Sequence, residues 1–189
     1  MALRSDWLKV PWRRTERRSD DPYWDFFIHT PAADRANSIL DVIRKAPEGN
    51  VFPTRADLHS PQVTASHVKE MARYLGADLV GITALDNDDA GHSFAIVCAV
   101  RACDDPREAL GIGGQVPVQN GLFVTFVLSA WIRELGYRAS MATSLDGTRL
   151  AVAAKLGTLD RIGRLVTAEY GTRVHVADVI RTDLPLTAA

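Results

Sequence analysis

The residues best suited to hold a ligand lie in consecutive loops of the second half of the chain. They are Met141, Thr143, Ser144, Gly157, Leu159, Arg161, Tyr170 and Arg173. Hydroxyl groups and glycine backbone can donate hydrogen bonds to amides, and arginines can pair with a phosphate. This combination is typical of a site for a large ligand with an apolar body. The alternative is that Arg161 and Arg173 form surface ion pairs.

Two side chains could take part in proton transfer or ligand contact. Tyr170 could donate a proton or simply pack its turn, and it is the one weak candidate for a catalytic residue. His92 lies between a polar loop and the apolar run 94–100, where strand ends commonly present side chains to a site. The alternative for His92 is a half-exposed histidine bonded to the loop. No Ser/His/Asp or Cys/His set has a recognisable spacing.

The two cysteines, Cys98 and Cys103, exclude several kinds of site. No Cys-x-x-Cys is present, and no second pair completes four thiolate ligands, so we predict no zinc site and no intrinsic iron–sulfur cluster. Cys98 lies inside an apolar run and is predicted to be a small core residue. The segment Gly111-Ile112-Gly113-Gly114 lacks both the third glycine of a dinucleotide fingerprint and the lysine of a phosphate loop, which favours a flexible loop.

Composition describes an ordinary soluble chain. It has 189 residues, 22 Lys+Arg against 23 Asp+Glu, a net charge of −1 and 47% hydrophobic residues. Such a balance argues against a nucleic-acid binder, which needs a basic excess. Arginine pairs at 13–14 and 17–18 precede Ser-Asp-Asp-Pro, not the apolar stretch of an export signal, so we predict a cytoplasmic protein. The apolar run 121–132 is too short for a membrane span and indicates a buried helix.

The pattern of elements favours an α+β fold. We expect an aromatic and basic N-terminal arm at 1–31 and a single domain at 32–189. Helices are predicted at 36–44, 63–75, 121–135 and 149–156, with residues 112–120 as a loop, and the 63–75 helix is expected to bury Val63, His67 or Val68, Met71, Ala72 and Leu75. Strands are predicted at 78–85, 93–100, 138–142, 164–167 and 174–181, the first two forming an antiparallel pair.

Four segments in a fixed order resemble one family. Residues 156–173 read Leu-Gly-Thr-Leu-Asp-Arg-Ile-Gly-Arg-Leu-Val-Thr-Ala-Glu-Tyr-Gly-Thr-Arg, and residues 182–186 read Thr-Asp-Leu-Pro-Leu. Segments 68–82 and 130–139 look like that family's helix-then-strand entry and central helix. Together they resemble the cobalamin-binding domain of reductive dehalogenases and epoxyqueuosine reductase, over roughly residues 63–186.

The resemblance implies a nitroreductase-like fold, a mixed and mainly antiparallel sheet flanked by helices, that holds base-off cobalamin without a histidine below cobalt. Segment 57–62 agrees with this, because Gln62 replaces the glycine of the Asp-x-His-x-x-Gly motif and leaves His59 beside a helix that begins near Ser60. In the relatives a ferredoxin-like module follows the Leu-Pro-Leu ending, whereas Thr187-Ala188-Ala189 follows here. An iron–sulfur or flavin protein is therefore the expected electron donor.

Departures from the family pattern leave three functions open. Lys155 and Asp160 stand where the family usually has glycines, and Ala168 and Thr172 where it has prolines. The first function is a stand-alone cobalamin-binding protein, acting as carrier, sensor or corrinoid subunit of a reductase. The second is a small nitroreductase-like enzyme that uses flavin or processes cobalamin, and the third is a cofactor-free paralogue. A homodimer is a further expectation; nucleic-acid and membrane partners are not.

Overall fold

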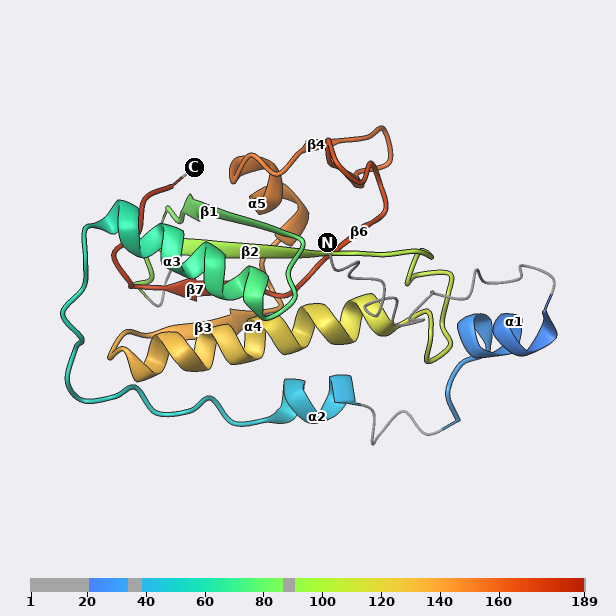
Figure 1. Cartoon of the computed structure of the whole chain (residues 1–189), viewed down its shortest axis with the longest axis horizontal. Coiled ribbons are helices and arrows are strands. Elements are labelled where there is room, and N and C mark those ends of the chain that lie inside the picture. The colour runs from blue at the N-terminus through green and yellow to red at the C-terminus, as the bar shows by residue number, and fades with distance from the viewer. Residues whose placement is uncertain (1–20, 34–38, 87–90, 189) are drawn as a thin grey trace, which may run out of the picture.

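The computed structural model describes residues 21–33, 39–86 and 91–188. The arginine pairs of the arm, residues 36–38 of the first predicted helix and residues 87–90 of the loop before His92 lie outside the described residues. The elements in Figure 1 are α1 (Pro22–His29), α2 (Ile39–Lys45), α3 (Pro61–Tyr74), β1 (Leu79–Ala84), β2 (Phe94–Arg101), α4 (Val116–Glu134), β3 (Ala139–Ala142), α5 (Gly147–Ala153), β4 (Thr158–Leu159), β5 (Leu165–Val166), β6 (Val174–Val176) and β7 (Val179–Thr182).

The main sheet has the order β1-β2-β7-β3. Strand β6 pairs with residues 99–101 of β2, and β7 pairs with residues 94–96 of the same strand. Each of these pairings is antiparallel, including the predicted pair β1 and β2, which aligns Val80 with Cys98. Strands β4 and β5 form a separate antiparallel pair, called here the β4–β5 hairpin (residues 158–166). The predicted α+β class with an antiparallel sheet is therefore confirmed.

Helices cover both faces of the sheet. On one face α3 and α4 pack over β1, β2 and β7, and α5 with the β4–β5 hairpin lies on the other (Figure 1). Cys98 is fully buried on the α4 side, where burial raises the pKa of its thiol to about 12. The prediction of a core cysteine is thus confirmed. Across the described residues, no helix is both long and apolar enough to cross a membrane.

Helix α3 forms where predicted, but one residue that was expected to be buried is exposed. Ser60 caps it by accepting a hydrogen bond from the Val63 amide, and Gly76 follows it with a φ of +114°. Val63 was predicted to face the core, but its side chain is 42% exposed. The reason is that Val63 sits in the first turn, whereas the buried stripe runs through Ala65, Val68 and Ala72.

Predictions for three other elements are wrong. Helix α4 begins at Val116, five residues before the expected start, because Pro117 suits a first turn that needs no amide donor. Helix α5 begins at Gly147 because the Asp146 carboxylate accepts the Arg149 amide. The single strand predicted at 174–181 is two strands, and the Ala177 amide between them bonds to the Cys98 carbonyl.

The Thr-Asp-Leu-Pro-Leu segment locks the end of β7 to the start of β3. The buried Thr182 hydroxyl donates to the Arg138 carbonyl at 2.6 Å and accepts the Leu184 amide at 3.0 Å. The Asp183 carboxylate accepts the Arg138 amide at 2.7 Å and its guanidinium at 3.1 Å. Leu184 is fully buried in the main core. This segment, on which the resemblance partly rests, therefore has a structural role here.

We predict that Lys155→Gly raises the free energy of unfolding by about 1 kcal/mol, because Lys155 is held at a φ of +60°, where a side chain is strained. Lys155 follows Ala154, the C-cap residue of α5, and the Leu156 amide bonds back to the Ala151 carbonyl, as in a glycine-terminated helix. Urea denaturation measures the change. Lys155→Ala, which keeps the strained backbone, is expected to leave stability nearly unchanged, and an equal gain from both variants would contradict the explanation.

Candidate functional site

A cavity of about 450 Å³ opens at the end of the sheet where β2 finishes. Three separate segments form its walls: residues 102–107 after β2, residues 163–165 of the β4–β5 hairpin, and residues 172–176 leading into β6. The pairing of β6 with β2, in which His175 lies opposite Val100, brings the first and third segments together. A cavity of this size falls in the range that small-molecule ligands occupy.

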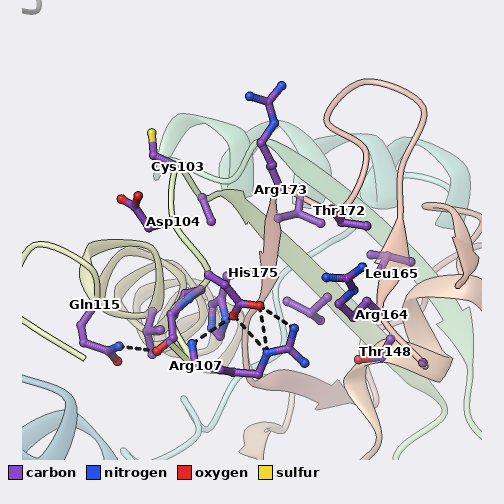
Figure 2. Close-up of a pocket in the computed structure, with 17 residues that line it drawn as sticks. Cys103, Asp104, Arg107, Gln115, Thr148, Arg164, Leu165, Thr172, Arg173 and His175 are labelled. Atoms are coloured by element: carbon purple, nitrogen blue, oxygen red, sulfur yellow. Dashed lines mark hydrogen bonds and ion pairs between the residues drawn. The ribbon is translucent and has the colours of Figure 1, made fainter. Parts of the chain in front are cut away.

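The cavity combines an apolar surface with hydroxyl groups. Val118 of α4, Leu165 of β5 and the two valines of β6 supply the apolar surface. Thr148 of α5 and Thr172 add hydroxyl groups at the opposite side of the cavity from Gln115 (Figure 2).

Two of the three arginines of the cavity are held by carboxylates. Arg107 pairs with Asp105 at 2.6 Å, and this bonding lowers the pKa of Asp105 to about 2. Arg164 pairs with Asp160 at 2.8 Å, and bonds from its backbone and side chain lower the pKa of that carboxyl group. Both pairs therefore stay ionised at neutral pH. Asp160, where the resemblance predicts a glycine, closes the turn of the β4–β5 hairpin in this chain.

Arg173 differs from the other two arginines. It is exposed at the rim of the cavity, and Figure 2 shows its guanidinium directed away from Arg107 and Arg164. Its backbone carbonyl accepts the Ala102 amide at 3.0 Å, which ties the two walls together. Its side chain has no ion pair or hydrogen bond within the described part of the chain. Arg173 is therefore available to meet an anion that approaches from solvent.

His175 supplies a neutral imidazole beside these charges. Burial lowers its pKa below the usual value; nearby Asp178 opposes this effect, and Arg44 adds to it. The ring is therefore neutral at pH 7. Asp178 is itself engaged by the Arg44 guanidinium of α2, with both contacts at 3.4 Å.

The structure brings some of the residues predicted from sequence to this region. Arg173 lines the cavity, and Thr143 lines a second cavity of about 150 Å³ that shares Thr148 with it. Gly157 adjoins the β4–β5 hairpin, where Leu159 pairs with Leu165 and Arg161 lies in the exposed turn. These three residues lie next to the wall formed by residues 163–165 without lining the cavity themselves.

Four predicted residues lie outside both cavities. Met141 is half-buried on β3, with its sulfur 3.6 Å from the Thr125 hydroxyl, and Ser144 is exposed beyond that strand. Tyr170 lies in a turn in which its amide bonds to Thr167, and partial burial with nearby Asp78 raises the pKa of its phenol. His92 is buried at the start of β2, the opposite end of that strand from the larger cavity.

Sequence reasoning missed Asp105, Arg107, Gln115 and His175. Asp105, Arg107 and Gln115 lie in one segment that carries no known motif, and the pairing of β6 with β2 brings the distant His175 to it. The one signal in the sequence is the alternation Val174-His175-Val176, because a polar residue between two apolar ones in a strand faces the other side of the sheet.

No family model matches this sequence, and no curated protein matches it. Solved structures do match. The catabolic reductive dehalogenase NpRdhA is 27% identical with a TM-score of 0.63, over 86% of this chain and 26% of that chain. Its complex with 3-bromo-4-hydroxybenzoic acid gives 25% and 0.68 over the same shares. A reductive dehalogenase whose structure suggests a mechanism for B12-dependent dehalogenation gives 26% and 0.67, again over 86% and 26%.

Epoxyqueuosine reductase from Bacillus subtilis also matches, with 14% identity and a TM-score of 0.49 over 67% of this chain and 47% of that chain, which is too distant to support a conclusion. The chain spans about a quarter of the length of the dehalogenases that it matches. Over that quarter, this chain and the dehalogenases are similar both in sequence and in backbone structure. The resemblance read from the sequence is thus confirmed: most of this chain is similar to one segment of the B12-dependent reductive dehalogenases.

Proposed function

We propose that this chain binds a cobalamin-type corrinoid, in the base-off state and in the cytoplasm, for a redox system whose electrons come from another protein. One observation carries the proposal: 86% of the chain matches a B12-dependent reductive dehalogenase at 26% identity with a TM-score of 0.67. The proposal includes a nitroreductase-like arrangement of the fold. Its role is that of a carrier, a sensor or the corrinoid subunit of a reductase.

The groups that line the larger cavity fit the periphery of a corrinoid. Such a ligand has an apolar macrocycle edged with amides and a tail that contains a phosphodiester. Val118, Leu165 and the valines of β6 offer apolar contact. Thr148 and Thr172 can donate hydrogen bonds to amides, and Arg173 can pair with the phosphate. A bound corrinoid would supply a cobalt centre that can be reduced and can then pass electrons to a substrate.

The chain's own residues would bind this ligand by shape and charge. The paired Arg107 and Arg164 are already fixed, so binding costs little ordering of their side chains. Neutral His175 adds no charge beside the apolar surface. We propose further contacts from Thr143 of the second cavity and from the hairpin residues Gly157, Leu159 and Arg161. Contacts from Met141, Ser144, Tyr170 and His92, which line neither cavity, stay predictions from the sequence.

Absorbance spectroscopy tests the proposal. The purified protein is incubated with hydroxocobalamin or, in parallel, with flavin mononucleotide, and each sample is passed through a gel-filtration column. We expect corrinoid absorbance to be retained at one equivalent, with the band shift of the base-off state. Retention of flavin alone would replace the proposal with a flavin-dependent redox protein. Retention of neither would favour the cofactor-free paralogue.

A charge reversal at the rim sharpens the test. Arg173→Glu is expected to weaken hydroxocobalamin binding by about tenfold, because a cation that faces the tail phosphate becomes an anion. Arg73→Glu is the matched control, since Arg73 of α3 is also an exposed arginine without an ion pair among the described residues, but it lines neither cavity. Isothermal titration measures both dissociation constants. Equal weakening by both variants would indicate a general effect of protein charge and not a contact at the cavity.

A further inference from the structure

The segment between β2 and α4 forms one wall of the larger cavity, and its hydrogen bonds make it a unit. We call residues 105–115 the wall loop. The Gln115 side-chain amide donates to the Pro106 carbonyl at 2.7 Å and to the Ala109 carbonyl at 2.9 Å. The Ala109 amide bonds to the Asp105 carbonyl at 2.8 Å, and the Gln115 amide bonds to the Gly111 carbonyl at 3.0 Å. Any shift of the loop therefore moves Arg107 and Gln115 at the cavity.

The outer side of the wall loop is covered by α1, as Figure 1 shows near the start of α4. The Gly111 amide donates to the Ile28 carbonyl at 2.7 Å, and the Gly113 amide donates to the Phe27 carbonyl at 3.0 Å. The Ile28 side chain is only 4% exposed. The glycines permit this contact, because a Cβ at Gly111 would collide with the Phe27 carbonyl and one at Gly113 with the Phe27 ring.

Helix α1 and the wall loop depend on each other for order. An isolated helix of eight residues is marginal in water, and Asp21 caps only one of its amides. The wall loop contains neither strand nor helix before α4 begins. Its glycines, which the sequence predicted to form a flexible loop and not a phosphate loop, receive the backbone of α1.

We propose that α1 positions the wall of the cavity, with Ile28 and Gly111 as positioning residues: docking of α1 on the outer side of the wall loop holds Arg107 and Gln115 in place on its inner side. Affinity for a ligand in the cavity then depends on whether α1 is docked. By thermodynamic linkage, a bound ligand strengthens the docking of α1 by the same factor.

Hydrogen exchange tests, without any ligand, whether docking of α1 holds the wall loop in place. In Ile28→Ser, we expect the amides of Ala109 and Gln115 to exchange about tenfold faster than in the wild type. These two amides bond within the wall loop and not to α1, so their exchange reports the loop itself. Phe26→Ser is the control on the same helix, because Phe26 is 65% exposed. Ile28→Val keeps the buried contact and is expected to restore slow exchange.

Two results would overturn this half of the proposal. One is faster exchange in Ile28→Ser at Gly111 and Gly113 only, since these amides lose their α1 partners in any case. The other is an equal effect of Phe26→Ser. Amides of β2, which pair within the sheet, verify that each variant is folded. Unchanged exchange at β2 separates an undocked α1 from a protein that has lost its fold.

The functional half rests on the proposed function. With hydroxocobalamin as the probe, Ile28→Ser is expected to raise the dissociation constant about fivefold, and Ile28→Val is expected to restore it. In the wild type, hydroxocobalamin should slow exchange of the Thr30 amide, which bonds to the Phe26 carbonyl at the end of α1. Unchanged affinity in Ile28→Ser would overturn the coupling. If the wild type retains no hydroxocobalamin, the proposed function fails, while the exchange at Ala109 and Gln115 still decides whether α1 positions the wall.

Discussion

Thr182→Val is expected to lower the free energy of unfolding by about 2–4 kcal/mol, although the two side chains have nearly the same shape. The threonine hydroxyl both donates to the Arg138 carbonyl and accepts the Leu184 amide, and the residue is fully buried. Valine would leave the buried Leu184 amide without a partner, at a cost of about 1–3 kcal/mol. The Arg138 carbonyl would keep only the longer bond from the Asp183 amide at 3.3 Å, and loss of the threonine bond to this carbonyl would cost about 0.5–1.5 kcal/mol more. Urea denaturation monitored by circular dichroism measures the loss.

Thr187→Val provides the comparison for this effect. Thr187 lies five residues further along the chain and is exposed, so its replacement should change stability by no more than about 0.5 kcal/mol. A small effect at both positions would mean that water reaches the Leu184 amide in solution. A large effect at Thr182 alone would establish the Thr-Asp-Leu-Pro-Leu segment as a lock between β7 and β3.

Gly157→Ala is expected to have the second largest effect, about 1–3 kcal/mol of destabilisation together with weaker retention of hydroxocobalamin. An added Cβ would collide with the Val166 carbonyl, which belongs to the backbone of the β4–β5 hairpin and cannot rotate away. The hairpin must therefore shift, and it carries the wall formed by residues 163–165. Thermal unfolding and gel filtration with hydroxocobalamin measure the two consequences separately.

Gly171→Ala separates this clash from the general cost of replacing a glycine. Gly171 lies in the turn after the hairpin, lines neither cavity, has a φ of +58° and has open space around the position of a Cβ. Alanine there should cost about 1 kcal/mol through backbone strain, with the hairpin and the cavity left in place. Loss of hydroxocobalamin in both variants to the same extent would argue against the clash at Gly157 as the cause.

Periodic patterns made most of the fold predictable. The apolar strands β1 and β2 and the helices α3 and α4 each bury a continuous run or stripe, and such patterns depend on neighbours in the sequence alone. Boundaries were harder, since they depend on single local contacts. The early start of α4 follows from Pro117, and the start of α5 follows from the cap at Asp146.

The candidate site was predictable only in part, because its residues converge from distant segments. Arg173 could be singled out from its place in the family-like segment 156–173, and it does line the larger cavity. Arg107, Gln115 and His175 could not, since only the pairing of β6 with β2 brings their segments together. Similarly, the glycines at 111 and 113 are explained by α1, which lies some eighty residues earlier in the chain.

The place of β7 in the sheet has a consequence for how the protein is made. This strand, the last in the described chain, lies between β2 and β3, and it pairs Arg181 with Ala95 on one side and with Ser140 on the other. During synthesis on the ribosome, β2 and β3 therefore lack their common neighbour until residues 179–182 have been translated. Contacts this far apart in sequence form slowly. The nascent chain would expose the apolar strand 94–101 during that interval, and an exposed apolar strand without its neighbour is prone to aggregation.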